Sequence, residues 1–307
     1  MHVPVLAPEQ RPFACIRGSF RVERRQNLHG RRRVTGRRSS PTRWARRAIC
    51  SFLPMLHIED RGTGAALVLL HGTPTMPRHL RPLAERLSAR WRTLLVHLPG
   101  YGESASLVPY NLDRAHELVE EAVAARGVVR AHLIGHSGGA NRAFAIATRG
   151  KLAVASIVAL SPIARFPDEV ARGYIELAGG LRGGADLTPM MAELMLSPAG
   201  RMHPDWVAEV QSWAHASRGD DLARELEAFA HSPDLLGAIG RLEMPILLRV
   251  GALDRATPTV FSDEIVGAAK HATLQVVPDV GHAILCEDLE GTADAIARHL
   301  EVVEVAE

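Results

Sequence analysis

Seven short runs of apolar residues recur from residue 55 onward, and they limit the possible folds more than any other feature of the chain. Most of these runs are continuously apolar, as in "ALVLLH" at 66–71, instead of alternating with polar residues. A strand with this pattern needs cover on both of its faces. The predicted strands are 55–60, 66–71, 92–97, 130–135, 154–160, 245–250 and 273–277.

Segments with a helical period of apolar residues separate these runs, at 77–89, 112–126, 139–149, 259–269 and 284–300. A regular order of strand, helix and strand is typical of a parallel sheet with helices on both sides. The sequence therefore predicts an α/β fold with a mostly parallel sheet.

The alternation is interrupted once, by roughly 75 residues without a convincing strand, which is too long for an ordinary connection in a compact α/β unit. Helical patterns fill this stretch near 168–181, 187–196, 204–217 and 220–231. We therefore expect an inserted helical cap at 166–241, and a core made of 55–165 and 242–307.

Residues 1–54 form an Arg-rich arm that differs in composition from the rest of the chain. Residues 1–50 hold 13 Arg and no Lys against two Glu, so they carry a net charge of +11, and the remaining 257 residues carry −9 of the total of +2. We expect an extension with too few apolar residues to fold. An organellar transit peptide and a misassigned start, with Met55 as the true first residue, stay open; nucleic-acid binding by the arm is the less favoured interpretation.

The remaining composition is that of a globular protein. Hydrophobic residues make up 47% of the chain, but no apolar run approaches the ~18 residues that cross a bilayer, so no membrane span is expected. The three cysteines, Cys15, Cys50 and Cys286, form no CxxC pair, which favours a reducing, cytoplasmic location and gives no thiolate metal site. The sequence does not indicate an oligomeric state.

The segment GHSGG at 135–139 places a serine between glycines, after a predicted strand and before a helix rich in small residues. This is the G-x-S-x-G pattern of a nucleophile elbow, in which a tight bend exposes the serine hydroxyl and glycines stand where side chains would clash. We expect Ser137 to be a nucleophile; a purely structural turn is the alternative.

A nucleophilic serine needs a general base and an acid that orients the base. Among the 15 histidines, His282 in "VVPDVGHAILCE" follows the last predicted strand, at the same end of the sheet as Ser137. Asp254 in "LLRVGALDRATP" follows the preceding strand, and Asp279 and Asp263 are its rivals. The order Ser, Asp, His places all three at the carboxyl ends of parallel strands.

Hydrolysis through a serine also needs donors for the negative oxygen of the tetrahedral intermediate. The loop HGTP at 71–74 follows the predicted strand 66–71. We expect the backbone N–H of Thr73 to converge with that of Gly138 on one oxygen, as an oxyanion hole.

Taken together, residues 55–300 resemble the α/β-hydrolase superfamily, in the branch with an inserted cap. The resemblance is carried by five motifs: HGTP at 71–74, LPGYGES at 98–104, GHSGG at 135–139, GALD at 251–254 and GH at 281–282. It implies the fold and a Ser-His-Asp catalytic triad. Many relatives carry an acid where this chain has His97, which implies an altered loop anchor or a histidine bordering the site.

The resemblance also implies a reaction class. Epoxide hydrolases and haloalkane dehalogenases of this fold use Asp where this chain has Ser137, so they are excluded. We expect a serine hydrolase that cleaves a carboxylic ester or lactone of a small apolar molecule, without cofactor or metal. A carbon–carbon bond hydrolase, an amidase, an acyltransferase and a receptor-like, ligand-binding member of the fold remain alternatives.

The substrate-binding side chains are the least defined part of the prediction. Apolar residues of the predicted cap could line a pocket, or could pack the cap onto the sheet instead. His136, next to the nucleophile, is a further candidate. The candidates are His136, Met191, Met195, Trp206 and Trp213, with Met190 beside them in the sequence.

Overall fold

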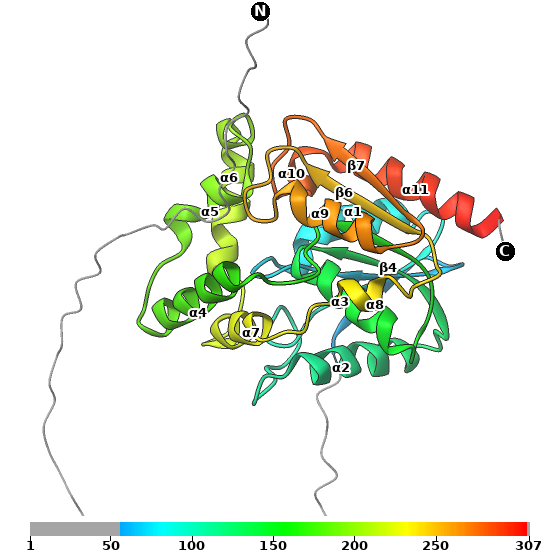
Figure 1. The fold of residues 1–307 in the computed structure, drawn as a ribbon, viewed down its shortest axis with the longest axis horizontal. Helices are drawn as coiled ribbons and strands as arrows, with labels where there is room; N and C mark the ends of the chain where they lie inside the picture. Colours follow the sequence, from blue (N-terminus) through cyan, green and yellow to red (C-terminus); the bar gives the residue numbers. More distant parts are fainter. Residues whose placement is uncertain (1–55, 306–307) are drawn as a thin grey trace, which may run out of the picture.

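The computed structural model describes residues 56–305, so the predictions made for the Arg-rich arm and for Met55 lie outside the described residues. Seven strands form one sheet in the order β1-β3-β2-β4-β5-β6-β7 (Figure 1). All neighbours are parallel except β1, which pairs antiparallel with β3. The strands are β1 Ile58–Arg61, β2 Ala66–Leu70, β3 Arg92–Val96, β4 Arg130–His136, β5 Ala153–Leu160, β6 Ile246–Gly251 and β7 Ala272–Val277. The predicted fold class is confirmed.

Helices cover both faces of the sheet, as the continuously apolar strands require. In β2, Val68 and Leu70 belong to one buried cluster, whereas Leu67 and Leu69 belong to another. The first cluster includes side chains of α2, α3, α8 and α9, and the second includes side chains of α1, α10 and α11. The core helices are α1 Pro77–Leu87, α2 Leu112–Ala124, α3 Gly138–Arg149, α9 Thr259–Ala268, α10 Ile284–Glu287 and α11 Leu289–Val305.

One predicted helix, 284–300, is wrong as a single element, because it is divided into α10 and α11. Asp288 between them has φ −148° and ψ 53°, which is not helical. Its carboxylate accepts a hydrogen bond from Arg249 on β6. This long-range ion pair coincides with the break.

A helical insertion, residues 166–241, separates β5 from β6. It contains α4 Asp168–Arg182, α5 Thr188–Met195, α6 Pro204–Ser212, α7 Asp221–Ala230 and α8 Leu236–Ile239, together with two short 3₁₀ turns. Four of these helices lie where the sequence predicts them, and α8 was not predicted. In Figure 1, α4 to α7 gather at one end of the sheet.

A buried polar network joins this insertion to the core. Arg142 on α3 pairs with Glu225 on α7, and both side chains are fully buried. The hydroxyls of Tyr101 and Tyr110 donate to the same carboxylate, with O···O distances of 2.6 Å and 3.2 Å. Helix α3, the loop after β3 and the insertion are therefore fixed to one another.

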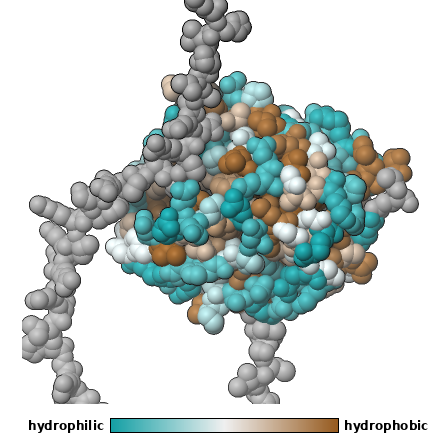
Figure 2. All heavy atoms as spheres, viewed as in Figure 1, coloured by the Kyte–Doolittle hydropathy of each residue, from teal (hydrophilic) through white to brown (hydrophobic). Residues whose placement is uncertain are grey.

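Within residues 56–305, no helix is long and apolar enough to cross a membrane. On the face drawn in Figure 2, hydrophobic residues are interspersed with hydrophilic ones.

We expect Glu225→Gln to lower the free energy of unfolding by roughly 3–5 kcal/mol, because the cation of Arg142 would then be buried without an anionic partner. Urea denaturation measures this loss. The matched control is Glu227→Gln on the same helix, which removes an exposed ion pair with Arg182 and should cost at most about 1 kcal/mol. Equal losses in the two variants would contradict this account.

Candidate active site

Ser137 lies on a tight bend between β4 and α3. Its backbone has φ 54° and ψ −120°, a strained conformation for a residue with a side chain. Its N–H donates to the carbonyl of Leu160 on β5 (2.8 Å), and its own carbonyl accepts from Ala140 (2.9 Å). These bonds hold the bend at the carboxyl end of the sheet.

Glycines on both sides of Ser137 allow the bend to form. A Cβ on Gly135 would lie 2.5 Å from the backbone nitrogen of Ala140. A Cβ on Gly139 would overlap the carbonyl oxygen of Leu70 and lie 2.6 Å from that of His71. Helix α3 therefore begins in backbone contact with the end of β2, and no side chain fits between them.

The HGTP loop lies directly against this bend. A Cβ on Gly72 would lie 2.9 Å from the Cβ of Ser137, and one on Gly138 would lie 2.9 Å from Oγ1 of Thr73. His71 positions the loop, since its Nδ1–H donates to the carbonyl of Gly72 and its Nε2 accepts from Leu98. Thr73 and Gly138, the two predicted oxyanion donors, are thus neighbours in space.

His282 and Asp254 are in direct contact. Nδ1 of His282 lies 3.0 Å from Oδ1 and 2.9 Å from Oδ2 of Asp254, and both side chains are buried. With the proton on Nδ1, this bond leaves Nε2 as a proton acceptor. Within residues 56–305, the side-chain hydrogen-bond partners of the His282 ring are Asp254 and Thr257, and neither rival acid, Asp279 or Asp263, is one of them.

The loop after β6 holds the carboxylate of Asp254 in place. Its Oδ1 accepts the backbone N–H groups of Ala256 (3.0 Å) and Thr257 (2.8 Å). Burial by itself raises the pKa of Asp254, but the charge of His282, its hydrogen bond and the hydrogen bond from the N–H of Thr257 lower it more, so the net shift is downward. Asp254 is therefore an anion that orients His282.

A hydrogen bond links the bend at Ser137 to the loop that carries His282. The Nε2–H of His136, the residue before Ser137, donates to the backbone carbonyl of His282 (2.9 Å). His136 is fully buried, and burial lowers its pKa to about 3, so it is neutral. This contact supports a positioning role for His136, whereas the sequence suggested contact with substrate.

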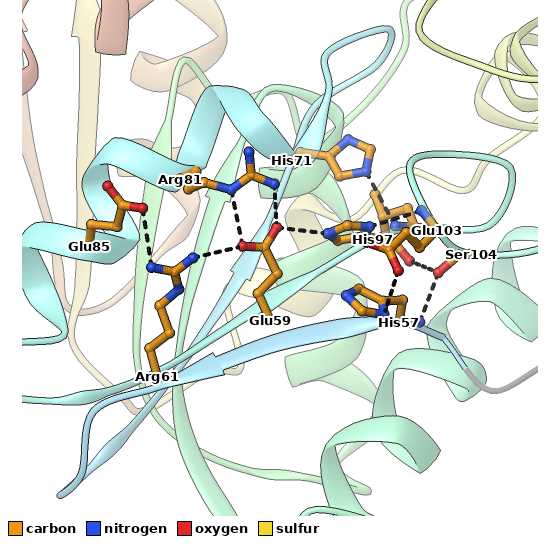
Figure 3. A network of polar contacts seen from close by, with 10 residues as sticks. His57, Glu59, Arg61, His71, Arg81, Glu85, His97, Glu103 and Ser104 are labelled. Carbon is orange, nitrogen blue, oxygen red and sulfur yellow. Dashed lines mark hydrogen bonds and ion pairs between the residues drawn. The ribbon is translucent and has the colours of Figure 1, made fainter.

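His97 anchors the LPGYGES segment, as Figure 3 shows. Its Nδ1 accepts the N–H of Glu103 and its Nε2–H donates to Glu59, both at 3.0 Å. Arg81 binds the same Glu59 carboxylate, and its hydrogen bonds are the main reason that the pKa of Glu59 falls to about 2. Of the two predicted possibilities for His97, the loop anchor is the one that the structure supports.

The predicted apolar pocket residues occupy different positions in the insertion. Met191 and Met195 on α5 are buried, and the carbonyl of Met195 accepts the N–H of Ala283, next to His282 (2.7 Å). Trp206 on α6 is partly exposed and stacks on His203 with 4.0 Å between ring centroids. Trp213 is fully buried and donates its Nε1–H to Glu209.

Sequence reasoning missed Thr257, and it named His136 as a candidate for substrate contact without its contact to the His282 loop. Thr257 bonds both Asp254 and the carbonyl of Ser161, and His136 bonds the carbonyl of His282. The contacts of Thr257 with Ser161 and of His136 with His282 join residues far apart in the chain, so they have no local sequence signal. Between residues 56 and 305 there is no group of three or more His, Cys, Asp or Glu side chains suited to hold a metal ion.

A model of the "Alpha/beta hydrolase family" matches residues 67–295. This match covers most of the chain, every strand of the sheet except β1, and all five motifs, and the chain therefore belongs to the α/β hydrolase family.

Among curated relatives, a pimeloyl-[acyl-carrier protein] methyl ester esterase of Xanthomonas campestris is 30% identical over 79% of this chain and 98% of its own length. The enzyme of the same name in Chromobacterium violaceum is 28% identical over 80% of this chain and 98% of its own. Among solved structures, a thermophilic esterase from Thermogutta terrifontis aligns with a TM-score of 0.76, 24% identity, and coverage of 81% and 93% of the two chains. That structural likeness shows the fold.

We expect Gly139→Ala to lower the free energy of unfolding by about 3 kcal/mol or more, because its methyl group would collide with the backbone of β2. Chemical denaturation measures the loss. The control is Gly173→Ala on α4, where a Cβ meets nothing within 4 Å and helix propensity should raise stability by roughly 0.5–1 kcal/mol. Similar effects of both substitutions would contradict the packing at Gly139.

We expect the advantage of the wild type over Glu59→Gln to shrink as the pH falls. The pKa of Glu59 is lowered from 4.5 to about 2 in the folded state, so its charge contributes stability above the unfolded value and loses it as pH falls through the folded value. Unfolding free energies measured at several pH values from neutral to acid test this. A difference that does not depend on pH would contradict it.

Proposed function

We propose that this chain is a serine hydrolase that cleaves a carboxylic ester or lactone of a small, apolar molecule through an acyl-enzyme intermediate. The observation that carries the proposal is the buried contact of His282 with Asp254, in a loop bonded through His136 to the bend that holds Ser137. A base, its orienting anion and a serine on a strained bend are the parts that acyl transfer needs.

In the proposed reaction, Oγ of Ser137 forms a bond to the substrate carbonyl carbon while Nε2 of His282 takes the hydroxyl proton. The carbonyl electron pair moves to oxygen, and the anion accepts hydrogen bonds from the N–H groups of Thr73 and Gly138. When the carbonyl reforms, the bond to the leaving alcohol breaks and His282 gives the alcohol its proton. Water, deprotonated by His282, then attacks the acyl-enzyme and releases the carboxylic acid and Ser137.

Asp254 supports both steps without exchanging a proton. Its lowered pKa keeps it anionic, so it stabilises the imidazolium that forms on His282 and holds the ring with Nε2 free. We assign the helical insertion, residues 166–241, as the cap that encloses the substrate, since α5 contacts the His282 loop and α7 contacts α3.

The activities of the relatives favour ester chemistry. The curated relatives named above are methyl ester esterases, and an enol-lactonase from Burkholderia xenovorans shares the fold with a TM-score of 0.72. We propose ester cleavage for this chain, but we do not propose the acyl and alcohol groups of the relatives' substrates. The cytoplasmic location suggested by cysteine usage remains a prediction.

We expect the wild type to hydrolyse members of a panel of short p-nitrophenyl esters and lactones, and Ser137→Ala to lose about 10³-fold or more in kcat, since removing the nucleophile of a triad abolishes most of the catalysis. A fluorophosphonate probe should label the wild type and fail to label Ser137→Ala. The matched control is Ser88→Ala, at the exposed end of α1, which should keep full activity and labelling.

Two results would overturn the proposal. A wild type that neither turns over any ester or lactone nor takes the probe would point to a ligand-binding member of the fold. Product mass that shows transfer to an added alcohol in preference to water would point to an acyltransferase instead.

A further inference from the structure

Two helices of the insertion contact two different parts of the candidate active site. The end of α5 lies against the His282 loop, where the N–H of Ala283 donates to the carbonyl of Met195 (2.7 Å). A Cβ on Gly281 would lie 2.7 Å from the backbone nitrogen of Ser197, just after α5. Helix α7 instead lies against Gly138, the proposed oxyanion donor, through the ring of Phe229.

The ring of Phe229 lies against the position that the Cβ of a side chain at residue 138 would take. A Cβ on Gly138 would lie 3.2 Å from both Cε2 and Cζ of Phe229, which is tighter than nearly all real Cβ contacts. The ring is 1% exposed. The edge of this aromatic ring therefore bounds the space beside the residue that follows the nucleophile.

The ring is held in this position from several sides. The guanidinium carbon of Arg142 lies 4.7 Å from its centroid, a cation–π contact, and the ring of Phe166 lies 5.3 Å away. Glu225, one turn earlier on α7, pairs with the same Arg142. Because the ion pair is buried and shared with two tyrosines, α7 cannot easily move Phe229 aside.

The chemistry of acyl transfer indicates which side of the site takes the alcohol of the substrate and which side takes its acyl group. The leaving alcohol must receive its proton from His282, so it lies on the side of the His282 loop and α5. The acyl group is the other substituent of the carbonyl carbon, and we place it on the opposite side, toward Gly138 and α7. On the basis of the proposed function, we infer that Phe229 limits the size of the acyl group, and that the end of α5 around Met195 borders the alcohol.

The inference predicts that the enzyme prefers short acyl chains and that Phe229 causes this preference. The experiment uses two series of substrates with the full chain. The first holds p-nitrophenol constant and lengthens the acyl group from acetate to octanoate. The second holds the acetyl group constant and lengthens the alcohol. For each variant, the measured quantity is the ratio of kcat/KM for the long substrate to that for the short one.

We expect Phe229→Ala to raise the long-to-short ratio in the acyl series by about tenfold or more, since one methylene group in a pocket can change kcat/KM by that factor. Its ratio in the alcohol series should stay within about twofold of the wild type. Met195→Ala should give the reverse pattern, with the larger change in the alcohol series. Phe229→Leu keeps more of the core and should raise the acyl ratio by a smaller factor.

The matched control is Phe144→Leu on α3, which removes an equally buried ring and so loosens the helix that α7 contacts through the Arg142–Glu225 pair. It should leave the acyl ratio unchanged. Fluorophosphonate labelling and thermal melting check that each variant is folded with an intact nucleophile. If Phe229→Ala does not fold, Phe229→Leu against Phe144→Leu decides.

The inference is overturned if folded, labelled Phe229 variants keep the acyl ratio of the wild type, if Phe144→Leu changes it equally, or if Phe229→Ala affects the alcohol series more. Failure of the proposed function has a different signature, because then the wild type turns over neither series and takes no probe. Substrate preference separates the assigned role from a structural one, since lost packing alone lowers kcat/KM for short and long acyl groups alike.

Discussion

The contact of helix α3 with the end of strand β2 is the constraint on which the rest of the site depends. At Gly139 the two backbones are so close that not even a methyl group fits between them. This approach sets the bend at Ser137, and it brings the HGTP loop after β2 against the first turn of α3. The spacing of the proposed nucleophile and oxyanion donors is therefore a property of backbone packing, and the side chains around it only refine it.

Much of this arrangement could be predicted from the sequence, because it is encoded locally. A continuously apolar strand of five to eight residues is recognisable in the sequence as a run of apolar residues. Every predicted strand has a counterpart in the sheet. The tight bend is visible as glycines around Ser137. Asp254 and His282 could be selected because each follows a strand in a parallel sheet, whose carboxyl ends meet at one edge.

The features that could not be predicted depend on partners far apart in the chain. The break at Asp288 coincides with its ion pair to Arg249 on another strand, and the local pattern around it is helical throughout. Likewise, nothing near Glu225 indicates that its carboxylate will be buried against Arg142. Pairs of this kind become favourable only after the sheet has brought their elements together, so a reading of local patterns does not detect them.

The link from His136 to the carbonyl of His282 bears on how such an enzyme can adapt to a new acidity. Since burial lowers the pKa of His136 to about 3, this histidine is neutral in milder solutions, and the charge of the link between the bend at Ser137 and the His282 loop does not change there. The hydrogen bond that joins the two parts of the site is thus separate from the side chain of the proposed base. Substitutions around His282 can therefore change the surroundings of the proposed base while this link stays as it is.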